Sequence, residues 1–135
     1  MTRLLELINF DFKMLKIKIE KDKTKGRKIV AASSFKKNEI IEMCPLIFMG
    51  EAEEGIISNI NIRNYVFAWD TRLVLALGFG SLYNHSYYPN AIYIKDYDNE
   101  SINFVALQNI EIGEEITINY NGDPNSMEPL WFDVV

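Results

Sequence analysis

The stretch GFGSLYNHSYYPNA, residues 78–91, gathers Gly, Asn, Ser and Pro residues around His85, the one histidine of the chain. These residue types are typical of turns and loops, yet apolar runs stand on both sides of the stretch. A loop that lies against an apolar core must satisfy its own backbone hydrogen-bonding groups. We therefore expect residues 78–91 to be built into the fold.

The composition around this loop is that of one compact domain. The chain has 135 residues, of which 48% are hydrophobic and 13% aromatic, enough for a single core. One cysteine, Cys44, cannot form an internal disulfide, and one Cys with one His cannot build a structural zinc site. No apolar run is long enough to span a bilayer, and Glu6 and Asp11 interrupt the start of the chain where a secretory signal would be apolar. We therefore predict a cytoplasmic protein that does not associate with membranes.

The net charge of -5 is unevenly distributed. Eight Lys and Arg residues face two acidic residues over residues 13–28, whereas nine acidic residues and no Lys or Arg follow from Asp96 onward. The basic run is typical of a solvated strand face and turn. The acidic half disfavours nucleic acid and would attract a cationic protein segment. We therefore expect a basic, lysine-containing protein partner and no direct binding to nucleic acid.

Short segments rich in Ile, Val and aromatic residues predict a mainly β fold. The predicted strands are residues 15–22, 27–32, 39–49, 72–78, 91–97, 101–108 and 114–120. Two short helices are predicted at residues 3–8, with Thr2 as N-cap, and at residues 51–61, where acidic residues crowd the first turn. Met14 precedes the first alternating strand, so we divide the chain into an extension, residues 1–13, and a single domain, residues 14–135.

Most common catalytic motifs are missing from the sequence. It lacks the phosphate-binding loop, the HExxH zinc motif, the CxxC motif and the GxSxG nucleophile elbow. His85 and Ser86 do not form a plausible dyad, because adjacent residues of an extended chain point to opposite sides.

Three segments, in this order, give the sequence its resemblance to a known family: residues 25–41 (KGRKIVAASSFKKNEII), residues 84–91 (NHSYYPNA) and residues 104–120 (FVALQNIEIGEEITINY). Together they resemble the SET-domain family of protein lysine methyltransferases, from about Lys25 to Phe132. The absence of Cys clusters suggests a compact form without zinc-binding flanks, and residues 121–134 resemble the end of small bacterial-type members. The resemblance implies several short curved β-sheets with a C-terminal pseudoknot and one or two short helices.

The resemblance also implies a site that binds S-adenosylmethionine and a target lysine. Tyr120 matches the catalytic tyrosine, which we interpret as a hydroxyl that orients the amine, since tyrosine is a poor base at neutral pH. The implied cofactor-binding residues are Gly26, Arg27, Lys28, Asn84, His85 and Tyr120. The lysine stem packs well between aromatic rings. The candidate channel residues are Tyr65, Tyr93, Ile118, Trp131 and Phe132.

Two functional hypotheses follow from these residues. The first is an S-adenosylmethionine-dependent lysine methyltransferase, which the presence of Tyr120, Asn84 and Asn119 favours. The second is an inactive SET-like module that holds a lysine-rich protein partner. It arises because the family's first motif usually reads Gly-x-Gly, whereas Lys28 stands here in the second glycine position. The sequence leaves the number of methyl groups transferred and the oligomeric state open.

Overall fold

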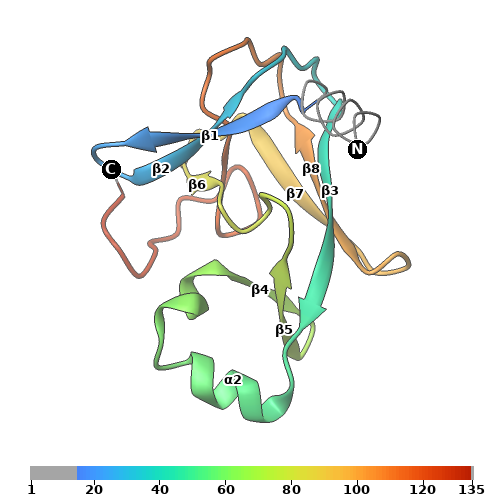
Figure 1. The fold of residues 1–135 in the computed structure, drawn as a ribbon, viewed down its shortest axis with the longest axis vertical. Coiled ribbons are helices and arrows are strands. Elements are labelled where there is room, and N and C mark those ends of the chain that lie inside the picture. Colours follow the sequence, from blue (N-terminus) through green and yellow to red (C-terminus); the bar gives the residue numbers. More distant parts are fainter. Residues whose placement is uncertain (1–14, 135) are drawn as a thin grey trace, which may run out of the picture.

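The computed structural model describes residues 15–134, which form short strands in three small sheets with one α-helix (Figure 1). The mainly β prediction is therefore confirmed. The predicted helix at residues 3–8 and the extension over residues 1–13 lie outside the described residues. Within residues 15–134, no helix has the length and apolar character needed to cross a membrane.

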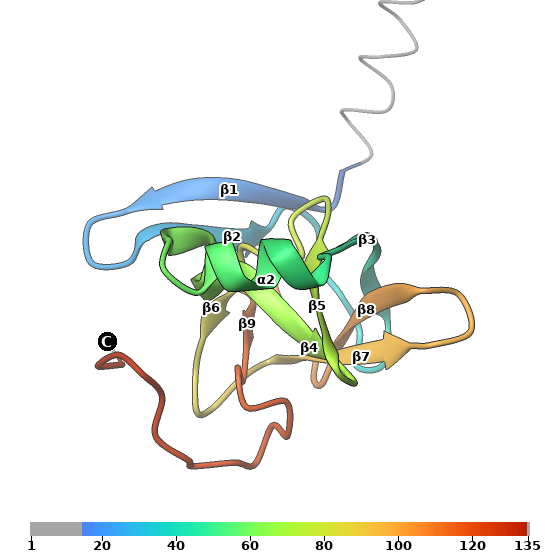
Figure 2. The same cartoon turned by 90° about the horizontal axis from the view of Figure 1, so that it is seen from below.

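The first sheet is the antiparallel hairpin of β1 (Ile17–Asp22) and β2 (Gly26–Ala31). Its turn is closed by the Asp22 carboxylate, which accepts hydrogen bonds from the backbone N–H groups of Thr24 and Lys25 at 2.8 Å. The end of β2 is fully buried, because residues 29–31 face the core. Figure 2 shows the hairpin lying across one side of the molecule. The predicted hairpin is thus present, with boundaries shifted by one or two residues.

The second sheet has five antiparallel strands in the order β4-β5-β3-β8-β7. The strands are β3 (Ile40–Phe48), β4 (Val66–Trp69), β5 (Arg72–Ala76), β7 (Ala91–Asp96) and β8 (Ser101–Ala106). Strand β4 was not predicted from the sequence. It exists because a two-residue turn, with Asp70 at a φ of 52°, pairs Trp69 with Arg72 and folds residues 66–69 back on β5.

The helical region between β3 and β4 is shorter than predicted. Helix α2 covers Glu51–Ile57, and a 3-10 helix, η1, covers Asn61–Tyr65. The Glu53 carboxylate accepts a hydrogen bond from the Gly50 N–H at 2.7 Å and so caps the start of α2. The helix ends early because the Ser58 hydroxyl donates to the Gly55 carbonyl at 2.8 Å and the Asn-rich segment that follows disfavours helix.

The third sheet is small but organises the site. Strand β6 (Asn84–His85) pairs in parallel with β9 (Thr117–Ile118). The segment before β9 lies against β2 on its other side, where the Ile116 N–H donates to the Ile29 carbonyl at 2.8 Å. The Asn90 side chain further donates to the Glu115 carbonyl and accepts from the Thr117 N–H. Residues 113–118 are therefore enclosed between β2 and the segment 84–90, which is the crossing expected of the pseudoknot.

The loop that leads into β6 is fixed by one carboxylate. Glu42 on β3 accepts hydrogen bonds from the Phe79 N–H at 2.9 Å and from the Tyr83 hydroxyl at 2.8 Å. Gly78 has a φ of +66°, and a Cβ at Gly80 would stand 2.7 Å from the Cys44 sulfur. The two glycines of the GFG stretch are thus explained by backbone conformation and close packing.

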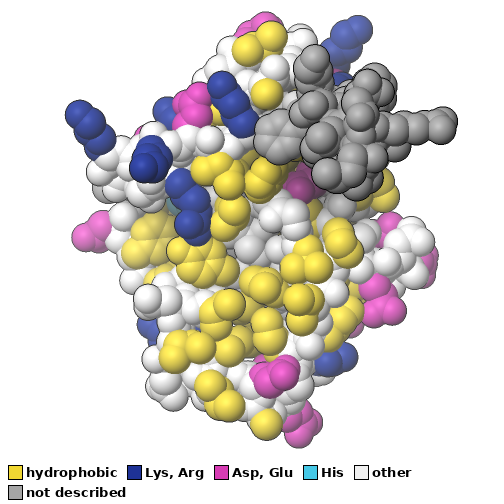
Figure 3. Space-filling model, in the orientation of Figure 1, with side chains coloured by type: hydrophobic (Ala, Val, Ile, Leu, Met, Phe, Trp, Pro, Cys, Tyr) yellow, Lys and Arg dark blue, Asp and Glu magenta, His cyan; other side chains and the backbone are white. Residues whose placement is uncertain are grey.

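Apolar side chains gather across the middle of the face shown in Figure 3, over β4, β5 and the loop that follows β5. This region includes a shallow hollow of about 310 Å³. Its apolar lining comes mainly from Ile62, Leu75, Leu77 and Leu82. The hollow adjoins the candidate site, because Tyr65 and Leu82 also line the second cavity described below.

Candidate active site

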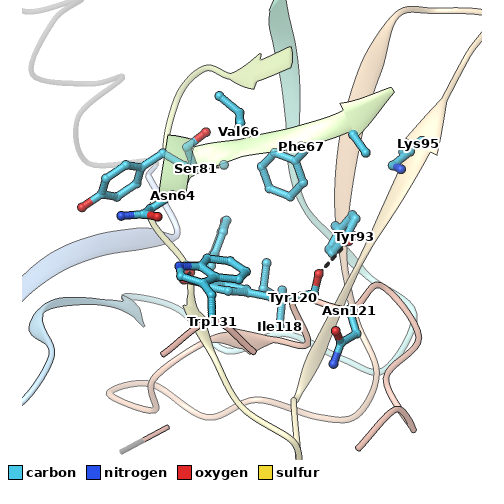
Figure 4. A pocket seen from close by; sticks show the side chains of 14 residues that line it. Asn64, Val66, Phe67, Ser81, Tyr93, Lys95, Ile118, Tyr120, Asn121 and Trp131 are labelled. Carbon is cyan, nitrogen blue, oxygen red and sulfur yellow. Dashed lines mark hydrogen bonds between the residues drawn. The ribbon is translucent and has the colours of Figure 1, made fainter. Parts of the chain in front are cut away.

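The first cavity has a volume of about 290 Å³ and lies between β4, β7, β9 and the C-terminal segment. Figure 4 shows its side chains converging from these elements. Of the residues predicted to line a lysine channel, four line this cavity: Tyr65, Tyr93, Ile118 and Trp131. Burial raises the pKa of Tyr93. Six of the fourteen residues that line the cavity are aromatic, which suits the aliphatic stem of a lysine.

The second cavity, of about 550 Å³, lies between the β1–β2 turn, the loop before β6 and the C-terminal segment. Gly26, Arg27, Asn84 and Tyr120 line it, as do Trp131 and Phe132. The two cavities share part of their walls. The shared residues are Asn64, Tyr65, Ser81, Tyr120 and Trp131. A group that reaches this wall from either cavity therefore comes close to Tyr120.

Tyr120 is held at the junction by both its backbone and its side chain. Its hydroxyl donates to the Tyr83 carbonyl at 2.6 Å, and its backbone N–H donates to Nδ1 of His85 at 3.0 Å. Burial above all, with smaller contributions from Tyr65 and Glu115 and an opposing one from Arg27, raises the pKa of the hydroxyl to about 12. The hydroxyl is therefore neutral near pH 7. Because the Tyr120 hydroxyl donates its proton to the Tyr83 carbonyl, its oxygen can only accept a hydrogen bond from any further group.

The C-terminal segment lies over the junction. The Trp131 ring stacks on the Tyr120 ring at 6.1 Å with an interplanar angle of 18°, yet Trp131 remains 59% exposed. Polar contacts hold the segment, because the Asn119 side chain donates to the Ser126 carbonyl and the Asn121 side chain donates to the Glu128 carbonyl. Trp131 therefore covers the site from outside the hydrophobic core.

Phe132 lies elsewhere than the sequence analysis suggested. It is absent from the lining of the first cavity and instead lines the second and a third cavity of about 310 Å³. Its ring lies edge-on to His85 at 6.4 Å. Phe132 thus stands beside the residues that were predicted to hold the cofactor.

Asn84 is oriented by two acceptors. Its amide nitrogen donates to the Arg27 carbonyl at 2.7 Å and to Oε2 of Glu115 at 2.8 Å. The other carboxylate oxygen of Glu115 pairs with Lys25 at 2.8 Å, and both side chains of this ion pair are largely buried. Both amide hydrogens of Asn84 are used, so the amide oxygen is the group that can accept from a ligand.

His85 is 5% exposed, and its Nδ1 accepts the hydrogen bond from Tyr120. Burial, with a smaller contribution from Lys25, lowers its pKa. Since Nδ1 is an acceptor, the neutral ring carries its proton on Nε2, and this atom has no hydrogen-bond partner among the described residues. His85 lines the third cavity together with Asn84 and Phe132.

The side chains of Arg27 and Lys28 go to different sides of β2. The Arg27 guanidinium lies 5.5 Å from the centre of the Tyr65 ring and lines the second cavity. Lys28 is absent from the lining of the first two cavities, and its ammonium lies 3.9 Å from the Asp22 carboxylate on β1. The side chain at the second glycine position of the motif is therefore directed away from the second cavity.

Sequence reasoning did not single out several residues of the site. They are Asn64, Phe67, Ser81, Tyr83, Lys95, Glu115 and Asn121. Glu115 carried a signal, since it lies in the GEEITINY motif five residues before Tyr120. Ser81 and Tyr83 lie in the stretch 78–91 and Asn121 directly follows Tyr120, but the sequence does not show that these side chains line a cavity. Asn64, Phe67 and Lys95 come from segments whose positions depend on the pairing of distant strands, and no local pattern marks them.

With this geometry established, comparisons with known proteins give a consistent result. The model of the SET domain family matches residues 26–121. A histone-lysine N-methyltransferase of Schizosaccharomyces pombe, described as specific for H3 lysine-37, is 29% identical over 119 residues, which cover 87% of this chain and 77% of that protein. A crystal structure of a candidate histone methyltransferase of Plasmodium falciparum matches with a TM-score of 0.66 and 35% identity, covering 78% of this chain and 92% of the other.

The chain therefore belongs to the SET-domain family of protein lysine methyltransferases. The predicted family and fold are confirmed by the matched region and by the structural likeness. The bacterial-type character, the domain boundary at residue 14 and the cytoplasmic location stay predictions.

Proposed function

We propose that this protein transfers a methyl group from S-adenosylmethionine to the side-chain amine of a lysine in a protein substrate. The observation that carries the proposal is the wall shared by the first and second cavities, which contains Tyr65, Tyr120 and Trp131. A methyl donor in one cavity and an amine in the other would meet at this wall. Family membership and the name of the yeast relative support the same chemistry.

The residues of the second cavity fit the cofactor. Asn84 uses both amide hydrogens on protein acceptors and keeps its oxygen available for an ammonium group. Gly26 and Arg27 offer backbone groups, and Phe132 offers a ring surface. In the third cavity, which shares Asn84 and Phe132, Nε2 of His85 is a buried donor without a partner among the described residues. When bound, S-adenosylmethionine would supply an electrophilic methyl group that a neutral amine can attack in line.

The residues of the first cavity would position that amine. The Tyr120 hydroxyl donates its proton to the Tyr83 carbonyl, so its oxygen can accept from the N–H groups of the amine. With a pKa raised to about 12, Tyr120 does not act as the base near neutral pH, and the proton of the target lysine would leave through water. With the substrate lysine in place, Trp131 and Tyr65 would pack against its stem and together with it exclude water from the junction.

The polypeptide around the target lysine is proposed to be basic overall. The nine acidic residues from Asp96 onward, without any Lys or Arg, favour a cationic segment. The inactive binding module remains the competing hypothesis, but the direction of the Lys28 side chain removes its main argument, since Lys28 does not enter the second cavity.

A methyl-transfer assay tests this proposal. Purified protein is incubated with S-adenosylmethionine and either core histones or lysine-containing peptides, and mass spectrometry detects added methyl groups. We expect methylation of lysine that disappears when S-adenosylmethionine is omitted. Cofactor binding without transfer to any lysine substrate would favour the binding module instead.

A further inference from the structure

Lys95 is the one charged side chain among the fourteen residues that line the first cavity. It lies on β7, and it is the last Lys or Arg in the chain. In Figure 4 it stands beyond Tyr93, at the opposite end of the cavity from Trp131. The Lys95 ammonium is thus the one charged group in a cavity whose other lining residues are uncharged, and we ask which substrate group it could bind.

The Lys95 ammonium has no carboxylate partner among the described residues. Within residues 15–134, the ion pairs involve Lys16, Lys18, Lys25 and Lys28, and none involves Lys95. The neighbouring Asp96 lies on the other face of β7 and accepts hydrogen bonds from Asn99. The Lys95 side chain is half-buried, so its ammonium is partly removed from water and would gain from a negative partner.

The position of Lys95 along β7 indicates which part of a bound substrate its ammonium would contact. Tyr93 and Lys95 are two residues apart on one face of the strand, which separates them by about 6.6 Å. The Tyr93 hydroxyl donates to the Tyr120 carbonyl at 3.3 Å, so Tyr93 lies beside the residue that would orient the amine. The four-carbon stem of a lysine is of similar length, roughly 6 Å. A target amine near Tyr120 would therefore place the substrate backbone close to the level of Lys95.

We propose that Lys95 selects substrates that carry an acidic side chain within two residues of the target lysine. This inference rests on the proposed function, because it requires that the first cavity holds the target lysine. A carboxylate beside the target would pair with the Lys95 ammonium, whereas a basic neighbour would be repelled. The acidic half of the protein favours a basic segment as a whole, so the acidic side chain is expected at one position within it.

A peptide series tests the proposal. Each peptide has one central lysine as its only lysine, and Glu, Gln or Arg occupies in turn each of the two positions before and after it. The readout is kcat/KM with S-adenosylmethionine, followed by mass spectrometry. For the wild-type protein we expect Glu to exceed Gln at least fivefold at one position, mainly through KM. Lys95→Met should abolish this preference, and Lys95→Glu should reverse it in favour of Arg.

Lys37→Met is the matched control, because Lys37 is exposed and lines neither the first nor the second cavity. It should keep the wild-type preference. Circular dichroism and cofactor affinity establish that the Lys95 variants are folded, and if Lys95→Glu does not fold, Lys95→Met carries the test.

The outcomes distinguish a failure of the role proposed for Lys95 from a failure of the proposed methyltransferase function. Wild-type protein that methylates the peptides without preferring Glu at any position would overturn the role of Lys95 and leave the proposed function intact. A preference that survives in Lys95→Met would overturn it as well. If no lysine is methylated in any peptide or in core histones, the proposed function fails and the inference fails with it.

Discussion

Replacing Tyr120 by Phe separates the chemical role of the hydroxyl from its structural role. The substitution removes the 2.6 Å hydrogen bond to the Tyr83 carbonyl and leaves the ring, its contact with Trp131 and the backbone bond to His85 in place. Loss of one such bond costs about 1 kcal/mol, which lowers the melting temperature of a domain of this size by about 4 °C. The cofactor affinity should stay the same, because the proposed contacts of Asn84 and residues 26–27 are untouched.

The rate of methyl transfer should fall much further than the stability. Without the hydroxyl oxygen the amine is not oriented, and a loss of at least tenfold in kcat, about 1.4 kcal/mol, is expected at a temperature where the variant is fully folded. Calorimetry, thermal unfolding and the peptide assay measure the three quantities. Tyr97→Phe is the control, since Tyr97 packs on Trp69 and lines neither of the two cavities. A Tyr120→Phe protein with the wild-type kcat would refute the role assigned to Tyr120.

Three further predictions follow from the contacts around the site. Asn84→Ala should weaken cofactor binding and lower thermal stability together, because the Glu115 carboxylate and the Arg27 carbonyl lose a donor at a cost of about 1–3 kcal/mol; unchanged affinity in a folded variant would show that Asn84 does not hold the cofactor. A chain that ends at residue 125 should retain its β-structure by circular dichroism but lose methyl transfer. Trp131→Ala should lower the rate of methyl transfer more than the melting temperature, since Trp131 is 59% exposed and lies outside the core. A steep fall in the melting temperature of Trp131→Ala would contradict this. Burial lowers the pKa of His85 in the folded protein, so as the pH falls the unfolded chain takes up a proton at a higher pH than the folded protein does. The free energy of unfolding should therefore decrease as the pH drops below about 6.5. Urea unfolding at pH 7 and pH 5 should show a weaker pH dependence for His85→Gln than for the wild type.

The motif segments made the family and much of the fold predictable. The hairpin of β1 and β2 follows from the alternation of Ile17 and Ile19 with charged residues and from the turn at residues 22–25. Residues 114–120 were predicted as a strand, yet only Thr117–Ile118 form β9. The difference arises because this segment bonds first to β2 and then to β6, so neither pairing runs for long.

Other features depend on contacts between distant residues. Lys25 and Glu115 are ninety positions apart and form one ion pair beside Asn84. Lys95 lies in an ordinary alternating strand, and only the packing of β7 near β9 shows that it faces a cavity. Local patterns carry no information on such pairings, so the sequence indicated the chemistry of the site but not the groups that orient it.

In the proposed function, the second cavity holds S-adenosylmethionine next to Tyr120. Isothermal titration calorimetry of the wild-type protein with S-adenosylmethionine measures this binding, with Asn84→Ala as the matched variant. We predict one binding site per chain and markedly weaker binding in Asn84→Ala. A folded wild-type protein that releases or takes up no binding heat at any temperature, and whose melting temperature does not rise with the cofactor, would contradict it.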